Sequence, residues 1–236
     1  MNPLLNVIYE DEDYIIIDKP AGVLVHKTSI AKEEQKLIAV QILRDQIGCR
    51  VYPLHRIDRP TTGILVFAKS SEAAGLFQPL FPTDAVKKKY LAVVRGFMPE
   101  IPGTIDSPLK KDLHGELQEA RTEYSLISKS EIPYSSSPRY KTSRYSLIRA
   151  YPITGRMHQI RRHMAHLRHY IIGDTTHGDN KQNNFFRAQF DLNNLLLHAF
   201  QLDFIHPKKQ IPISVTAPLP SHFLEILKKL ELELPL

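Results

Sequence analysis

Short apolar runs separated by turn residues dominate the chain and predict a sheet. Residues 7–10 and 14–20 flank the acidic turn at residues 11–13, which is the pattern of a β-hairpin. Four further runs rich in apolar and β-branched residues predict strands, at 63–69, 89–96, 195–205 and 211–217.

Apolar residues recur at helical intervals in other segments. Three of these carry an end signal: 31–48 with Gly48 as a stop, 70–81 with Ser70 as a cap, and 221–234 with Ser221 as a cap. Residues 156–168 predict a fourth helix, and we expect one side of it to meet the core. That side carries Met157, Ile160, Met164 and Leu167.

The order of these elements indicates the fold class. Strands and helices interleave without regular βαβ alternation, so we expect an α+β fold rather than a doubly wound parallel sheet. We expect residues 1–236 to form a single domain. The Ser- and Pro-rich segment at 130–143 lacks apolar periodicity and predicts an exposed excursion or a mere linker.

Composition narrows the function classes. The single cysteine, Cys49, excludes an intrachain disulfide framework and a multi-cysteine zinc site, which favours the cytoplasm. No stretch reaches the roughly 18 apolar residues that span a bilayer. The net charge of +6 is compatible with an anionic partner but is also common in ordinary enzymes.

The positive charge is concentrated in residues 139–169, which contain eight Lys and Arg residues and no Asp or Glu. Guanidinium and imidazole groups on one surface would suit RNA phosphates, although a solvated basic face would have the same pattern. His163, His166 and His169 recur every three residues and could suggest a metal site. The interleaved arginines argue against it, because they would repel a divalent cation.

Asp58 lies between Arg56 and Arg59 in a loop that leads into a buried strand. The flanking cations favour an ionised carboxylate, and an ionised carboxylate can attack an electrophilic carbon. The run HRIDR by itself favours an ordinary loop salt bridge.

Several separated sequence blocks follow one another along most of the chain. They are DKPAGVLVH (18–26), HRIDRPTTGILVFAKS (55–70), KKKYLAVVRG (87–96), GRMHQIRRHMAHLRHYIIGD (155–174) and LLLHAFQL (195–202), followed by HP (206–207). In order and spacing these blocks resemble the RluA family of pseudouridine synthases, whereas one block alone would be only moderately specific. The resemblance implies a mixed, mainly antiparallel central sheet flanked by helices, with the active site in a cleft. We expect no separate N-terminal RNA-binding module beside this catalytic domain.

The resemblance also implies roles for single residues. Asp58 would be the nucleophile, Tyr90 the aromatic side chain of the uracil pocket, and Arg156 the partner of the catalytic carboxylate. Arg56 would enter the RNA stack where the target base has left, and Leu197 would line the pocket. We expect RNA to contact five arginines: Arg56, Arg59, Arg161, Arg162 and Arg168.

The implied reaction converts a uridine of structured RNA to pseudouridine by base flipping. It needs a nucleophile, a stacking surface and proton transfers, but no cofactor and no metal. Attack on ribose C1′ and elimination to a glycal both remain open. Two other classes are weighed against this reading, namely a non-catalytic RNA-binding protein and a metal-dependent nuclease.

Residues 161–186 resemble the TruC branch, which modifies uridine 65 of transfer RNA. Ribosomal RNA is the alternative substrate. The chain departs from the usual family pattern at Thr62, Met157 and Tyr170, none of which removes catalytic chemistry. The sequence implies no protein partner, and a monomer is expected.

Overall fold

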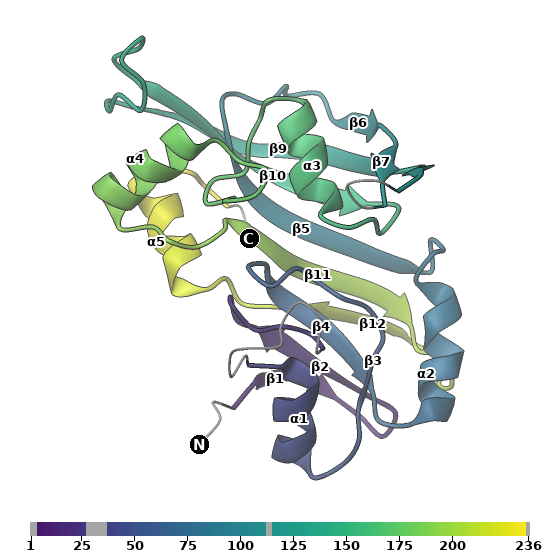
Figure 1. Cartoon of the computed structure of the whole chain (residues 1–236). Helices are drawn as coiled ribbons and strands as arrows, with labels where there is room; N and C mark the ends of the chain where they lie inside the picture. The colour runs from purple at the N-terminus through teal and green to yellow at the C-terminus, as the bar shows by residue number, and fades with distance from the viewer. Residues whose placement is uncertain (1–3, 27–36, 112–114, 235–236) are drawn as a thin grey trace. The chain divides into compact units, whose positions relative to one another are not determined.

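The computed structural model describes residues 4–26, 37–111 and 115–234. The chain divides into two compact units (Figure 1). Unit 1 comprises Met1–Lys88 and Ala199–Pro218, and unit 2 comprises Lys89–His198 and Leu219–Leu236. Each unit has strands and helices of its own, which confirms the α+β class.

The sheet of unit 1 has the strand order β1-β2-β4-β11, with β12 added to β11 and β3 added to β4. Its strands are β1 (Asn6–Glu10), β2 (Tyr14–Lys19), β3 (Tyr52–Pro53), β4 (Thr62–Ala68), β11 (Leu197–Ile205) and β12 (Pro212–Thr216). The ladders β1–β2, β2–β4, β3–β4 and β11–β12 are antiparallel. The predicted N-terminal hairpin is confirmed.

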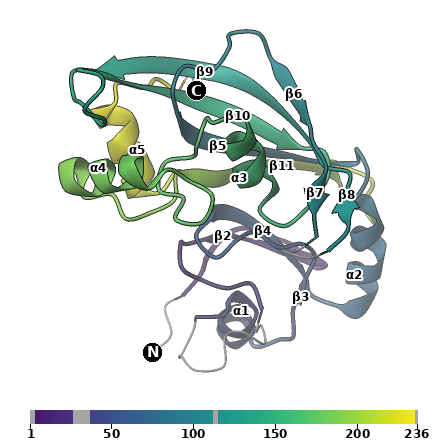
Figure 2. The same ribbon diagram turned by 45° about the horizontal axis from the view of Figure 1, so that its top comes forward.

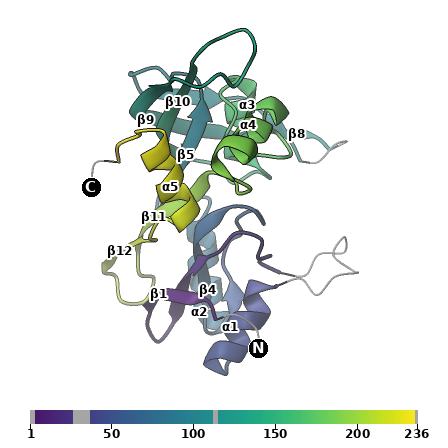
Figure 3. The ribbon, with the colours of Figure 1, turned by 90° about the vertical axis from the view of Figure 1, so that its left-hand side faces the viewer.

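Strand β4 is buried along its whole length. On one face Ile15 and Leu65 pack against helix α1 (Ala39–Ile47), which lies beside the strands (Figure 3). Successive strand residues point to opposite faces. Tyr14 therefore points the other way, and its ring contacts Phe77 of helix α2 (Ser71–Phe77) at 5.1 Å.

The two helices of unit 1 begin and end partly as predicted. Gly48 ends α1 in the left-handed region, with φ +70°, as expected of a glycine stop. The helix begins at residue 39, and residues 31–36 of the predicted helix lie outside the described residues. Ser70 caps α2 by accepting the N–H of Ala73 at 3.0 Å. A 3-10 turn over Gln78–Leu80 follows it.

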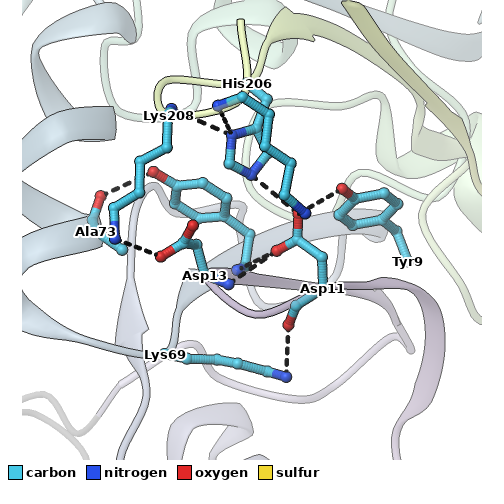
Figure 4. Close-up of polar contacts among 9 residues, drawn as sticks. Tyr9, Asp11, Asp13, Lys69, Ala73, His206 and Lys208 are labelled. Atoms are coloured by element: carbon cyan, nitrogen blue, oxygen red, sulfur yellow. Dashed lines mark hydrogen bonds and ion pairs between the residues drawn. The ribbon is translucent and has the colours of Figure 1, made fainter. Parts of the chain in front are cut away.

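Asp11 links the β1–β2 turn to the β11–β12 turn (Figure 4). Its Oδ1 accepts the N–H groups of Asp13 and Tyr14 at 2.9 and 2.8 Å, which shapes its own turn. Its Oδ2 accepts Nε2 of His206 at 2.9 Å and Nζ of Lys209 at 3.0 Å. Burial raises the pKa of the Asp11 carboxyl, but hydrogen bonds from Tyr14, Tyr9, Lys209 and Asp13 outweigh it and hold this pKa well below its usual range.

The imidazole of His206 is fully buried and held at both nitrogens. Nδ1 accepts the backbone N–H groups of Lys208 and Lys209, so the ring proton lies on Nε2, which faces Asp11. Nζ of Lys208 completes the link by pairing with Asp13 at 2.7 Å. The two turns are thus joined by several charged hydrogen bonds.

The sheet of unit 2 has the antiparallel order β5-β10-β9-β6, with a separate two-stranded ladder β7–β8. Its strands are β5 (Val86–Arg95), β6 (Gly103–Asp106), β7 (Leu109–Lys110), β8 (Leu117–Gln118), β9 (Arg121–Ile132) and β10 (Ser143–Pro152). Residues 133–142 of the predicted excursion form the turn that joins β9 to β10, and residues 130–132 and 143 belong to these strands, so the linker interpretation is wrong.

Helix α3 (Gln159–His166) lies over the strands of unit 2 (Figure 2). Ile160 and Met164 face the core as predicted, with 6% and 0% of their surface exposed. Met157 is 49% exposed, so its predicted place on the core face is wrong. The reason is that residues 156–158 form a turn, and His158 adopts a left-handed conformation with φ +53° just before the helix.

The remaining helices of unit 2 correct the sequence prediction in two places. Residues 180–190, which lie in none of the segments predicted to be helical, form α4 (Asn180–Phe190), which Asp179 caps. Helix α5 (Ser221–Lys229) is confirmed but ends earlier than expected, and Pro220 rather than Ser221 is its N-cap. Among the described residues, no helix combines the length and apolarity that crossing a bilayer requires.

Candidate active site

Asp58 lies in the loop between β3 and β4 of unit 1. The loop turns tightly, because the carbonyl of Asp58 accepts the N–H of Thr61 at 3.1 Å, just before β4 begins at Thr62. The Asp58 side chain is half-buried. Because β4 is fully buried, it fixes the end of the loop that carries Asp58.

Lys19, the last residue of β2, also holds this loop in place. The side chain is fully buried, and its Nζ donates to the carbonyls of Pro20, Val23 and Arg59 at 2.9, 3.0 and 3.2 Å. Gly22 adds a backbone bond to the carbonyl of Arg59 at 2.9 Å. The DKPAG and HRIDR blocks of the sequence are thus joined beside Asp58.

The electrostatics of this corner follow from burial. Desolvation lowers the pKa of Lys19 to about 7, and the carboxylates of Asp58 and Asp18 oppose that shift. Desolvation also raises the pKa of Asp18 to about 6. A positive charge on Lys19 therefore depends on its acidic neighbours.

His55, at the start of the HRIDR block, serves the structure of the loop. Its Nε2 accepts the backbone N–H of Val66 on β4 at 3.1 Å, so its ring proton lies on Nδ1. Desolvation and the charge of Lys88 lower the pKa of His55 to about 3. The residue is therefore a neutral anchor at neutral pH.

Arg56 and Arg59 are both exposed on either side of Asp58. Nε of Arg59 donates to the carbonyl of Gly22 at 3.1 Å, which directs the side chain along the loop. The exposed cations that the sequence predicted next to Asp58 are thus present.

Tyr90 and Leu197 belong to one apolar cluster in unit 2. Tyr90 lies on β5 opposite Ala150 of β10 and is half-buried, so its ring has one side on the core. Leu197 is only 3% exposed. It therefore supports the cluster against which Tyr90 packs.

Arg156 is held by Gln159, the first residue of α3. Oε1 of Gln159 accepts the N–H of Arg156 at 3.0 Å, and its Nε2 donates to the carbonyl of Arg121 and to Oγ1 of Thr122. Nε of Arg156 donates to the carbonyl of Glu119 at 2.9 Å. The guanidinium thus has a fixed origin and direction. Sequence reasoning did not find Gln159.

His158 continues this constrained segment. Its Nδ1 lies 2.8 Å from Nε2 of His177, with the two rings at an edge-to-face angle of 71°. Desolvation lowers the pKa of His177, which favours a neutral ring there. The left-handed backbone of His158 is therefore accompanied by a specific side-chain contact.

Two members of the basic segment are buried, which corrects their predicted place on an RNA-binding face. Arg161 is 3% exposed, and its Nε and Nη2 bind both oxygens of Asp174 at 2.8 Å. His163 is fully buried between Oγ1 of Thr122 and the carbonyl of Ser107. The sequence pattern does not show that Asp174 lies beside Arg161 in the folded chain and neutralises its charge.

Arg162 and Arg168 remain closer to the solvent. Arg162 is half-buried and donates from Nη1 to the carbonyl of Lys110 at 2.9 Å. Arg168 is exposed and follows α3 in a left-handed conformation with φ +60°. Both can reach an anionic surface, unlike Arg161.

The candidate residues are divided between the units. Asp58, Arg56 and Arg59 belong to unit 1, whereas Tyr90 and Arg156 belong to unit 2. Within the described ranges, no group of three or more His, Cys, Asp or Glu side chains is arranged to hold a metal ion.

The profile of the family described as RNA pseudouridylate synthase matches residues 13–166, a range that includes Asp58, Tyr90 and Arg156. The chain belongs to the RNA pseudouridylate synthase family. The resemblance found in the sequence blocks is thereby confirmed. The protein is an isomerase that acts on RNA, because these synthases rearrange a uridine without adding or removing atoms.

Individual members of the RNA pseudouridylate synthase family match nearly the whole chain. A protein of Vibrio vulnificus named tRNA pseudouridine synthase C is 45% identical over 97% of this chain and 96% of its own length. One of the same name from Vibrio parahaemolyticus is 49% identical over 86% and 85%.

Solved structures of the RNA pseudouridylate synthase family share the fold. Human RNA pseudouridylate synthase domain containing 4 covers 98% of this chain and 94% of its own, with a TM-score of 0.73 and 25% identity. Human RNA pseudouridylate synthase domain containing 1 has the same TM-score at 22% identity and covers 99% and 98%.

Proposed function

We propose that the protein converts uridine 65 of transfer RNA to pseudouridine, with Asp58 as the nucleophile. The observation that carries the substrate is the identity of 45% to a tRNA pseudouridine synthase C across 97% of this chain. Similarity on this scale extends well beyond the catalytic blocks. This extent of similarity supports a shared RNA substrate.

The proposed chemistry begins with the target uridine turned out of the RNA stack. The Asp58 carboxylate acts on the ribose while the bond from C1′ to N1 breaks. The uracil then turns and C5 bonds to C1′, which releases the Asp58 carboxylate from the ribose. C5 gives up its proton to water and N1 takes one up from water, so the product is an isomer of the substrate. The buried anchor at Lys19 supports this proposal, because it fixes the backbone beside the carboxylate.

Two residues of unit 2 have roles in the proposed reaction. Tyr90 offers an aromatic face for stacking on the flipped uracil, since its ring has one side on the core and is half-buried. Arg156 is assigned to pair with the nucleophile and orient it. The bonds of Arg156 to Gln159 and Glu119 support this role by limiting its rotamers.

RNA outside the reacting nucleotide is assigned to exposed cations. Arg56 fills the gap that the flipped base leaves in the stack, and Arg59, Arg162 and Arg168 contact phosphates. Arg161 is left out because Asp174 occupies it. We propose a cytoplasmic monomer as the working form, since transfer RNA is modified in that compartment and all assigned groups come from one chain.

The test is a map of pseudouridine in cells that lack their own modification at position 65. Expression of the wild-type chain is expected to restore pseudouridine there, and Asp58→Asn is expected to abolish it while RNA affinity stays within a few fold. Asp84→Asn is the matched control, because Asp84 is an exposed carboxylate of the same unit. Modification confined to ribosomal RNA, or full activity of Asp58→Asn, would contradict the proposal.

A further inference from the structure

A pocket of about 240 Å³ lies in unit 2 where the β9–β10 turn meets α4. The turn projects beyond α4 at the top left of Figure 1. Arginine, hydroxyl and aromatic side chains line the pocket, among them Arg95, Arg144, Tyr140 and Thr142. No step of the proposed reaction uses this pocket.

Ion pairs orient two guanidinium groups at the pocket but use only some of their N–H donors. Nη1 of Arg95 binds Asp179 at 2.8 Å, and Nε of Arg144 binds Glu131 at 3.0 Å. The arginine side chains are 42% and 59% exposed. Since a guanidinium carries five N–H donors, each retains donors for an anion.

The inner wall of the pocket is a fixed chain of hydrogen bonds. The hydroxyl of Tyr145 donates to Oε1 of Gln182 at 2.9 Å, and Nε2 of Gln182 donates to Oγ of Ser136 at 2.7 Å. Ser143 then links Ser136 to the carbonyl of Tyr134. Strand β10, helix α4 and the turn are thereby tied together, so the pocket is preorganised.

Aromatic rings stand beside these cations. Tyr140 is 57% exposed, and the guanidinium of Arg139 lies 5.4 Å from its ring centre. Phe97 is 36% exposed, with the guanidinium of Arg144 at 5.0 Å. Exposed rings next to cations are the combination that binds single-stranded nucleic acid, through base stacking and phosphate contacts.

The charge of the turn favours an anionic occupant. Residues 133–142 contain Arg139 and Lys141 and no acidic residue. The volume of about 240 Å³ falls below the ~300–1,000 Å³ of pockets for drug-sized ligands. A phosphate with its sugar suits that size better than a whole cofactor.

We propose that this pocket binds a backbone phosphate of the substrate RNA, with a neighbouring unpaired base stacked on Tyr140. The inference deepens the proposed function and rests on it for the identity of the RNA. Arg95 and Tyr90 are five residues apart on β5, or ~17 Å at about 3.3 Å per residue. The pocket thus contacts RNA away from the reacting uridine and contributes to substrate choice.

The test measures the affinity of unmodified transfer RNA transcript between 50 and 200 mM salt. Arg144→Gln is expected to weaken binding about fivefold and to lower the salt slope by about one. Tyr140→Ala is expected to weaken binding at least fivefold with an unchanged slope, because stacking carries no charge. Arg44→Gln is the matched control, since Arg44 is 54% exposed and paired with Asp45 in unit 1.

Equal affinities and slopes for Arg144→Gln, Tyr140→Ala and Arg44→Gln would overturn the inference. Tyr140 is exposed, so its variant keeps the test valid if Arg144→Gln fails to fold. Inorganic phosphate could also bind this pocket. If it does, and neither variant changes the affinity for RNA, then RNA is not the occupant. The affinity measurement does not require turnover. A failure to modify uridine 65 would therefore contradict the proposed function and is a separate result from this one.

Discussion

The carboxylate of Asp11 accepts a hydrogen bond from Nε2 of His206 at 2.9 Å, although 195 residues separate them in the chain. The bond connects two hairpin turns of unit 1, and Lys209 adds a second contact to the same oxygen. Both partners are held by further bonds, so the contact acts as a clasp between the turns.

We predict that Asp11→Asn lowers the free energy of unfolding by about 2 kcal/mol at pH 7, because the bonds to a charged acceptor are lost. The folded-state pKa of Asp11 lies below its unfolded value. Its stabilisation is therefore complete above that unfolded value and is lost as the pH falls further. Urea unfolding at pH 7, 4 and 2.5 should show wild type approaching the variant in acid. Asp45→Asn, at an exposed ion pair, should differ little from wild type throughout.

Lys19→Met should lower both stability and kcat. The variant leaves the carbonyls of Pro20, Val23 and Arg59 without their donor, which should cost about 2 kcal/mol at pH 7. Loosening the Arg59 carbonyl should reduce kcat more than it changes KM for RNA. Lys87→Met, at an exposed lysine of the same unit, is the control.

The same variant carries a pH signature. Burial lowers the pKa of Lys19 from its ordinary 10.5 to about 7, so between these values the unfolded chain binds more protons than the folded one. Wild-type stability should therefore gain from this residue as the pH rises from 7 toward 10.5. Unfolding at pH 7 and 9 should show the gap to Lys19→Met widening, and a constant gap would contradict burial of the charge.

Gln159→Ala should separate positioning from binding. Loss of the contact to the N–H of Arg156 is expected to reduce kcat roughly tenfold to a hundredfold, while KM stays within threefold. Gln159→Glu keeps the acceptor and loses the donor to Arg121, so its kcat should be intermediate. Equal losses in both variants would assign Gln159 to general stability alone.

Arg161 and Arg168 provide a pair of contrasting outcomes. Arg161→Met leaves Asp174 as an unpaired buried charge and should destabilise the protein by about 3–5 kcal/mol, with no change in the salt slope of RNA binding. Arg168→Met should alter stability by less than about 0.5 kcal/mol and lower the slope by about one. The reverse pattern would restore Arg161 to the RNA surface.

Local pattern was sufficient for much of the fold. Strands β2 and β4 were predictable because they are apolar runs bounded by turn residues, and Ser70 and Gly48 signalled helix ends correctly. Helix α4 was missed because its sequence NKQNNFFRAQF is largely polar. Tertiary contacts hold it in place, notably the edge-to-face contact of Phe186 with Tyr145.

The site was predictable in its charged loop but not in its supports. Asp58 stood out through its flanking arginines and the family blocks, whereas Lys19 and Gln159 act through contacts with residues distant in the chain. Arg161 was misplaced for the same reason, because its partner Asp174 lies beyond the helix. Charge counted along a sequence does not reveal which charges will be neutralised on folding.

The clasp at Asp11 has a consequence for synthesis on the ribosome. At about 5–20 residues per second, His206 is made roughly 10–40 s after Asp11, because 195 residues separate them. During that interval β11 is not available to pair with β4. The apolar residues that β4 buries in the folded protein are therefore not yet fully covered. The N-terminal hairpin is therefore synthesised early. Its contacts with the β11–β12 turn form only after the strands of unit 2 have left the exit tunnel.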